Sequence, residues 1–302
     1  MKRIRIHPRW SRGALVVGLL GIVAYSSALA QAQRARAHPF FTRLQRRPLV
    51  IAHRGGAGLW PEQTLYTFEQ AIALDVDALE MDVHQTADGV LVLMHDNTVD
   101  RTTNGHGSIK YMTLAEIKQL DAGYTWTTDD GQTFPFRNQG ITVPTLAEVF
   151  TMFPQTPMII EIKPSDPSIV KPFCQMIHDF DRTHLVQVGS IQASVLKAFR
   201  RECPAIATSS TIDEVALLWW LHLSRLSATC SPVFEALQIP EYAMGTQLIV
   251  PHFIRAAHRR GLEVHVWTIN ETDDMRRLLD LGVDGIITDY PDRLLKLTGR
   301  LP

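Results

Sequence analysis

The feature that most constrains the fold is a regular alternation, beginning at Pro48, of short β-branched runs with amphipathic segments. This alternation is typical of a parallel sheet wound with helices, because parallel strands need long crossover connections. Eight such units predict a closed TIM (β/α)8 barrel. The predicted strands are 49–53, 78–84, 158–163, 185–189, 206–210, 235–240, 263–269 and 285–288.

Helical patterns lie between these runs, with apolar residues recurring at spacings of three and four. They cover 65–74, 169–180, 195–203, 212–223, 254–260, 275–281 and 293–297. A chain of 302 residues with 45% hydrophobic content can bury a full core, which excludes a disordered polymer. We therefore expect one barrel domain over residues 49–302.

The run 90–95 follows the second strand too closely for a parallel crossover, so we expect it to run antiparallel as a hairpin. Asp88-Gly89 favours a type I′ turn, which would place His84 opposite Leu93 and Asp82 opposite His95. The next stretch, about 96–144, is rich in Thr, Asn, Gly and Asp and has one short helical pattern at 114–120. It predicts a small insertion after the hairpin of the second strand.

The N-terminus is basic and then apolar, and residues 1–61 contain no acid. Lys and Arg residues precede the uncharged stretch 13–30, which ends in Ala28-Leu29-Ala30, as in a secretory signal peptide. An uncleaved membrane anchor is the alternative, because 18 uncharged residues are at the lower limit for a bilayer span. Residues 31–48 form a basic linker. Both alternatives predict an exported or membrane-anchored protein, not a soluble cytoplasmic one, and the anchor implies membrane association through the N-terminus.

Charge and cysteine content exclude other classes of partner and site. Residues 1–30 hold five of the 30 Lys and Arg and none of the 31 acids, so the rest of the chain has a formal charge of −6. An acidic domain does not favour a nucleic-acid partner. Cys174, Cys203 and Cys230 have no metal-binding spacing, and we expect them to be buried apolar residues, with one disulfide open as an alternative outside the cytoplasm.

Charged and aromatic side chains lie at the predicted carboxyl ends of the strands, where barrel enzymes have their catalytic residues. They are His53, Arg54, Glu80, Asp82, His95, Asp96, Glu161, Lys163 and Trp267. Residues two apart on a strand share a face, so Glu80 lies beside Asp82 and Glu161 beside Lys163.

The three strand carboxylates, Glu80, Asp82 and Glu161, would repel one another at a single barrel mouth unless a cation joined them. Oxygen-only ligands favour a hard divalent cation, Mg²⁺ or Ca²⁺. Glu62 is a further candidate ligand, although a carboxylate at this place could instead cap the helix predicted at 65–74.

The remaining strand-end residues suit an anionic substrate. Arg54 offers a planar fork and Lys163 a point charge for a phosphate that bridges to the cation. His53 and His95 can act as general acid and base. Trp267 is a candidate substrate contact, with ordinary packing as its alternative. The set predicts metal-assisted phosphoryl transfer.

Six segments resemble, in order and spacing, the glycerophosphodiester phosphodiesterases, and the similarity runs from about residue 49 to 292. They are IAHRGGAGLWPEQT, ALEMDV, VLMHDNTVDRTTNGHG, IIEIKP, VWTIN and DGIITDYPD. The resemblance implies a barrel hydrolase in which His53 and His95 act as acid and base. It also implies that Glu80, Asp82 and Glu161 bind the cation. Arg54 and Lys163 would bind the phosphate. The resemblance further implies that the insertion helps to form a glycerol pocket.

One departure from this family lies in the first loop, where Glu62-Gln63-Thr64 replaces the usual Glu-Asn-Thr, which puts any contact of the amide in doubt. The expected function is metal-dependent hydrolysis of glycerophosphodiesters to glycerol 3-phosphate and an alcohol. A lysophospholipase D or related phospholipase acting on lipid head groups is the alternative within enzymes. A noncatalytic glycerophosphodiester-binding module is a third hypothesis, which the presence of both histidines disfavours.

Overall fold

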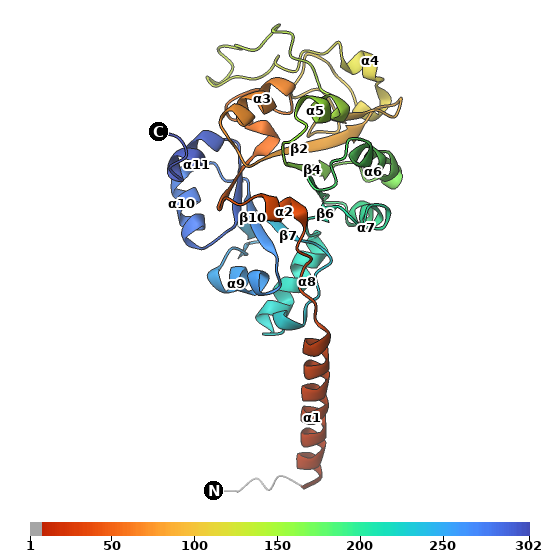
Figure 1. The fold of residues 1–302 in the computed structure, drawn as a ribbon, viewed down its shortest axis with the longest axis vertical. Coiled ribbons are helices and arrows are strands. Elements are labelled where there is room, and N and C mark those ends of the chain that lie inside the picture. The colour runs from red at the N-terminus through yellow and green to blue at the C-terminus, as the bar shows by residue number, and fades with distance from the viewer. Residues whose placement is uncertain (1–7) are drawn as a thin grey trace.

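A barrel of parallel strands forms the centre of the molecule in the computed structural model, which describes residues 8–302 (Figure 1). Its strands are β1 (Leu49–Ala52), β2 (Ala78–Gln85), β4 (Met158–Ile162), β5 (Val186–Gly189), β6 (Ala207–Thr208), β7 (Ala236–Pro240), β10 (Glu263–Trp267) and β11 (Gly285–Thr288). Neighbouring strands follow the order β6-β5-β4-β2-β1-β11-β10-β7, and all these pairs are parallel. A bridge between Ser209 and Ala236 nearly closes the barrel, which confirms the predicted fold.

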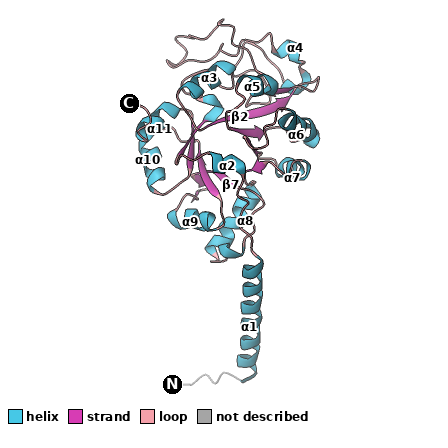
Figure 2. Ribbon diagram, in the orientation of Figure 1, coloured by secondary structure: helices cyan, strands magenta, loops and turns pink. Residues whose placement is uncertain are grey.

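Helices surround the barrel (Figure 2). They are α3 (Leu65–Ala73), α5 (Leu146–Met152), α6 (Val170–Asp179), α7 (Ala193–Glu202), α8 (Ile212–Leu223), α9 (Pro251–Arg259), α10 (Thr272–Asp280) and α11 (Pro291–Leu297). Helix α5 was not predicted, although Thr145 and Glu148 form a capping box at its start. A small β8–β9 ribbon (Tyr242–Ala243 and Thr246–Gln247) follows β7.

The core lies between the strands and these helices. Strands β1, β5 and β11 are buried at every residue, as expected of parallel strands that are covered on both faces. The insertion has its own small apolar cluster, which includes Val99, Ile109 and Val143, and carries the short helix α4 (Leu114–Ile117). It is therefore a packed substructure at one end of the barrel and not a loose loop.

The hairpin forms, but its predicted register is wrong by one residue. Strand β3 (Leu91–Leu93) runs antiparallel to β2, and His84 lies opposite Val92 instead of Leu93. The reason is the turn: Gly89 has a positive φ of 84°, but Asp88 does not, so a type I′ turn cannot form. The amide of Met94 donates to the carbonyl of Asp82 at 3.1 Å, whereas the prediction placed His95 opposite Asp82. His95 nevertheless follows β3 to the upper end of β2.

The N-terminal part consists of a projecting helix and a segment that folds against the barrel. Helix α1 (Pro8–Gln31) extends away from the body (Figure 1). Residues 33–44 continue into α2 (Pro39–Arg43), whose Phe40 and Phe41 are buried with side chains from the barrel strands. In the part of the chain that the structure describes, no helix is both long and apolar enough to cross a membrane. The basic residues Lys2, Arg3 and Arg5 of the predicted signal lie outside the described residues.

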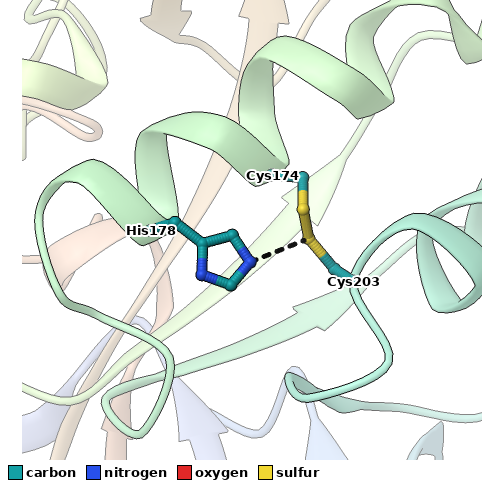
Figure 3. A group of neighbouring side chains, drawn as sticks. All are labelled: Cys174, His178 and Cys203. Carbon is teal, nitrogen blue, oxygen red and sulfur yellow. Dashed lines mark hydrogen bonds between the residues drawn. A yellow bond between two sulfur atoms is a disulfide. The ribbon is translucent and has the colours of Figure 1, made fainter.

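A disulfide joins helix α6 to the end of helix α7, through Cys174 and Cys203 (Figure 3). Their Cα atoms are 6.1 Å apart, and Nε2 of His178 lies 3.9 Å from Sγ of Cys203. Both cysteines are buried, as predicted, and they form the one disulfide that the sequence left open as an alternative, because the packing of two successive helices brings together residues that are 29 apart in the chain. Cys230 is free and half-buried.

Candidate active site

The first loop of the site is a tight turn at the end of β1. Arg54 has a left-handed φ of 51°, and Gly55 follows with a φ of 86°. A Cβ at Gly55 would lie 2.5 Å from Cγ2 of Thr67, so only glycine fits between this loop and α3. The turn directs the amide of Arg54 to Oε2 of Glu80, to which it donates at 2.9 Å.

Three carboxylates converge beside this loop, as the sequence predicts. The pairing of β2 with β4 sets Asp82 opposite Glu161, and Glu80 lies on the same face of β2. Oxygens of Glu80, Asp82 and Glu161 lie within 4.8 Å of one another. Burial and the negative charge of Asp82 raise the pKa of Glu80 to about 7. A buried carboxylate beside two other carboxylates needs a positive partner to remain ionised.

Lys163 supplies part of that positive charge. Its Nζ lies 2.9 Å from Oδ1 of Asp82 and 2.9 Å from Oε2 of Glu161. Burial alone would lower the pKa of Lys163, but the two carboxylates outweigh it and raise that pKa. The sequence analysis predicts that Lys163 binds a phosphate. In the structure its ammonium lies between two of the predicted cation ligands.

The carboxylate cluster fits a hard divalent cation in its donor atoms. Among the described residues, Oε1 of Glu161 is buried and has no hydrogen-bond partner. The single ammonium of Lys163 contacts Asp82 and Glu161 but not Glu80, so it does not balance the charge of three acids. An oxygen-only donor set with an unsatisfied oxygen suits Mg²⁺ or Ca²⁺ better than zinc.

His53 is held in one orientation by residues from the end of β11. Its Nδ1 lies 2.6 Å from Oδ1 of Asp289, and because a carboxylate only accepts, the Nδ1 carries the proton. Asn270 donates from Nδ2 to the other oxygen of Asp289 at 2.7 Å. Burial would lower the pKa of His53, but Asp289 and Glu80 outweigh it and raise that pKa. The Nε2 atom, 4.0 Å from Oε2 of Glu80, points to the cluster.

His95 has a similar carboxylate partner. Its Nδ1 lies 2.7 Å from Oδ1 of Asp96. Arg101, from the insertion, donates to Asp96 at 2.7 Å through Nε. Burial would raise the pKa of Asp96, but the hydrogen bonds from Arg101 and His95 lower it to about 2. Asp96 is thus ionised and fixes the ring of His95, leaving its Nε2 available for proton transfer.

Arg101 also reaches the first loop, which couples the two histidine regions. Its guanidinium donates to both oxygens of Glu62 at 2.8 and 2.7 Å, and Nη1 of Arg54 donates to Glu62 at 3.1 Å. Burial would raise the pKa of Glu62, but Arg101 and Arg54 outweigh it and lower that pKa. The carboxylate of Glu62 is therefore held by two arginines outside the three-acid cluster, and Thr64, not Glu62, caps α3.

Gln63 makes the amide contact that its departure from the family pattern put in doubt. Its Nε2 donates to Oδ2 of Asp82 at 2.6 Å, and its Oε1 accepts from the amide of Asp82 at 3.3 Å. The backbone at Gln63 is left-handed, with a φ of 61°. Gln63 therefore orients one member of the carboxylate cluster.

A cavity of about 420 Å³ lies between the first loop and the insertion, and neither the two histidines nor the three clustered carboxylates line it. Glu62, Arg101, Trp126 and Tyr290 are among its lining residues. Nε1 of Trp126 donates to the carbonyl of Ala57 at 3.1 Å and ties the insertion to the first loop. The predicted contact residue Trp267 ends β10, next to β11, with 40% of its side chain exposed, and does not line this cavity.

The site residues that sequence reasoning missed are Asp289 and Asn270, which orient His53, and Arg101, which binds Asp96 and Glu62. Asp289 directly follows β11, so the strand-end rule could have selected it. Asn270 ends the segment VWTIN, but nothing in the pattern indicates which side chain it holds. Arg101 lies in the insertion, where no periodicity predicts its direction.

The geometry matches known proteins along most of the chain. The model of the Glycerophosphoryl diester phosphodiesterase family matches residues 53–293. A glycerophosphodiester phosphodiesterase of Caldanaerobacter subterraneus is 34% identical over 82% of this chain and 97% of its own length. Lysophospholipase D GDPD1 of Mus musculus is 27% identical over 93% of both chains.

A solved structure agrees with this assignment. A phosphodiesterase of Oleispira antarctica, in complex with the product sn-glycerol-3-phosphate, has 27% identity and a TM-score of 0.67, and the match covers 84% of this chain and 97% of that one. The barrel, the strand-end residues and the extent of these matches agree. The chain therefore belongs to the glycerophosphoryl diester phosphodiesterase family and is a phosphoric diester hydrolase.

Proposed function

We propose that this hydrolase converts glycerophosphodiesters to glycerol 3-phosphate and an alcohol, with a divalent cation and with His53 and His95 as general acid and base. The observation that carries the proposal is the matched pair of histidines. Each Nδ1 is bound by an aspartate, Asp289 or Asp96, and each ring has its Nε2 left for proton transfer. The product named for the relative from Oleispira antarctica supports the choice of substrate.

Glu80, Asp82 and Glu161 would hold the cation, Mg²⁺ or Ca²⁺. When bound, it would polarise a phosphoryl oxygen and balance negative charge that develops on it. The guanidinium of Arg54 lies beside the cluster, with its Nε 3.7 Å from Oδ2 of Asp82 and without a hydrogen-bond partner among the described residues, and would bind the phosphate there. Lys163 would bind the same anion from the other side of Asp82.

The substrate brings its own nucleophile, the glycerol hydroxyl next to the ester. An internal attack gains from proximity, and no serine or cysteine is needed. One histidine Nε2 would take the proton of that hydroxyl while the other gives a proton to the departing alcohol. Water would then open the cyclic phosphate to glycerol 3-phosphate. A substrate analogue that lacks only this hydroxyl should be inert, and cleavage at the normal rate would refute the internal route.

The proposal is tested with the purified chain and glycerophosphocholine. We expect turnover that a chelator abolishes and that Mg²⁺ or Ca²⁺ restores. Asp82→Asn should lose both bound metal and turnover, whereas Asp273→Asn, at a fully exposed position on α10, should retain both. Full activity in excess chelator would overturn the metal requirement. An absence of any turnover, with tight retention of the substrate, would favour the noncatalytic binding module.

Hydrolysis of lysophospholipid head groups is a second candidate activity. It is favoured by the relative named Lysophospholipase D GDPD1, which matches over 93% of both chains. The internal route predicts that a lysophospholipid with a free neighbouring hydroxyl reacts, whereas a diacyl phospholipid does not. Turnover of lysophosphatidylcholine against glycerophosphocholine, measured with one preparation, decides between the two substrate classes.

We propose further that residues 1–30 direct the chain to export or anchor it to a membrane, with 31–48 as the link to the barrel domain 49–302. The basic start and the apolar stretch support this location, and so does a disulfide, which persists mainly outside the reducing cytoplasm. N-terminal sequencing distinguishes the outcomes. A chain that begins at Gln31 was cleaved, an intact chain in membranes is anchored, and an intact cytosolic chain refutes the proposal.

A further inference from the structure

The outer face of α8 is apolar from Ala216 to the end of the helix, whereas Asp213, one turn earlier on the same face, is exposed and paired with Lys197. Ala216, Leu217, Trp220 and Leu223 are exposed, and Trp220 has 67% of its surface accessible. At 100° per residue these positions form one continuous stripe that turns away from the barrel. A surface helix of a globular protein normally carries charged residues on such a face, as α10 does with Asp273 and Arg276.

The surroundings of this stripe carry positive charge and few acids. No acid occurs between Glu214 and Glu235. Helix α9 packs beside α8, with the rings of Trp219 and Phe253 4.9 Å apart, and it contains no acid. It exposes Arg255 and Arg259, and Arg225 is exposed just after α8. An apolar stripe with tryptophan at its centre and arginines at its rim is the composition of a surface that meets anionic lipid.

The stripe also adjoins α1. The 3₁₀ turn η4 (Ser227–Thr229) that follows α8 contacts α1, and the amide of Gln33 donates to Oγ of Ser231 at 3.1 Å. Figure 1 shows α1 leaving the body below α8. The described side chains of α1 are mostly apolar and exposed too, with Leu20 and Val23 at 64% and 65%. The two apolar surfaces thus lie at the same end of the molecule, on either side of η4.

We propose that the stripe Leu217–Trp220–Leu223 of α8 is a docking surface for a phospholipid bilayer that contains anionic lipid. The proposal rests in part on the proposed membrane association of the N-terminus, because α1 would bring this end of the barrel to the bilayer. The side chain of Trp220 enters the interface between head groups and acyl chains, and Arg225, Arg255 and Arg259 contact lipid phosphates. A lipid surface explains the arginine rim and the continuity with α1, which a contact between two copies would leave unexplained.

The test places a nitroxide spin label on the full chain, bound to vesicles of phosphatidylcholine and phosphatidylglycerol. Trp220→Cys carries the label in a Cys230→Ser background. The matched control is Met152→Cys, at another exposed apolar residue, which lies at the end of α5 near the insertion. Oxygen concentrates in the bilayer and a nickel chelate stays in water, so the ratio of the two collision rates reports depth. Turnover of glycerophosphocholine checks that each variant is folded.

We expect the label at position 220 to collide with oxygen more than with the chelate, and the label at position 152 to show the reverse. If both labels collide freely with the chelate while the chain stays on the vesicles, the α8 proposal is overturned and the N-terminal one stands. If the label at 220 is shielded from both probes and broadened by a second label, a copy of the chain covers the stripe and the proposal is wrong. A chain that never binds the vesicles overturns both proposals.

Discussion

The hydrogen-bond pattern around Asp289 predicts an unusually specific effect of Asp289→Asn. One oxygen of Asp289 accepts from Nδ1 of His53 at 2.6 Å and the other accepts from Nδ2 of Asn270 at 2.7 Å. Asn270 cannot turn over, because its Oδ1 accepts from the amide of Asp289 at 2.9 Å and from the hydroxyl of Thr288 at 3.2 Å. An asparagine at 289 must therefore present its NH₂ to His53, since facing Asn270 would set two donors against each other.

This substitution moves the proton of His53 from Nδ1 to Nε2. A neutral ring with Nε2 protonated cannot accept a proton at that atom, and its imidazolium form has lost the carboxylate that stabilised it. Either role of His53, acid or base, is impaired without a change in shape. We expect kcat to fall on the order of 10²- to 10⁴-fold, the usual contribution of a positioned acid or base, with KM changed little.

A second pair of aspartate and histidine provides the matched control. Asp284 precedes β11, Asp289 follows it, and Asp284 accepts from Nε2 of His258 at 2.8 Å at the opposite end of the barrel. Asp284→Asn should leave kcat unchanged. In addition, Asp289→Asn should cost nothing further in a His53→Ala background, because both changes remove one function. Equal losses from both asparagine variants, or additive losses with His53→Ala, would refute the tautomer argument.

Three further predictions concern the second histidine and stability. Arg101→Lys keeps the charge but not the planar fork that orients Asp96, so kcat should fall about tenfold at nearly constant KM, and an unchanged kcat would contradict this role. Burial lowers the pKa of His38 below its ordinary 6.5, so its contribution to stability is present above that value and is lost as pH falls below it. The free energy of unfolding of the natural chain relative to His38→Gln, measured by chemical denaturation, should therefore decline from pH 7.5 to 5.5. The Cys174–Cys203 disulfide closes a loop of 29 residues, and Cys174→Ala should lower the free energy of unfolding by about 3–4 kcal/mol, a loss that a reductant reproduces in the natural chain but not in the variant.

The barrel was predictable because its evidence is local and repeated. Each strand is a short β-branched run, and the predicted bounds agree with the structure to within one residue, or two at the ends of β6 and β10. The prediction of the hairpin failed because its register depends on the conformation of a single residue. The hairpin register depended on whether Asp88 adopts a positive φ, and its side chain instead accepts from the hydroxyl of Thr86 at 2.6 Å and from the amide of Leu114 at 3.0 Å. Leu114 lies in the insertion, outside any pattern of the hairpin itself.

The carboxylate cluster was predictable for the same reason as the barrel. A spacing of two on adjacent parallel strands places Glu80, Asp82 and Glu161 on one face, and the register of β2 with β4 brings them within reach. The position of Lys163 was not predictable, because its flexible chain can reach a substrate phosphate or turn back to Asp82 and Glu161. Geometry decides this competition, and spacing alone does not.

The insertion is where the sequence carried least information and the structure adds most. Arg101 is the only described side chain that bonds both Asp96, the partner of His95, and Glu62, the partner of Arg54. A chain of charged hydrogen bonds thus runs from Arg54 in the first loop to His95, the proposed acid–base group. Charged hydrogen bonds are strong only when both partners are held in place. The apolar cluster of the insertion holds the segment that carries Arg101, so the alignment of His95 depends on the packing of that cluster. The irregular segment therefore acts as part of the catalytic scaffold, and changes in its small core should reach the active site through Arg101.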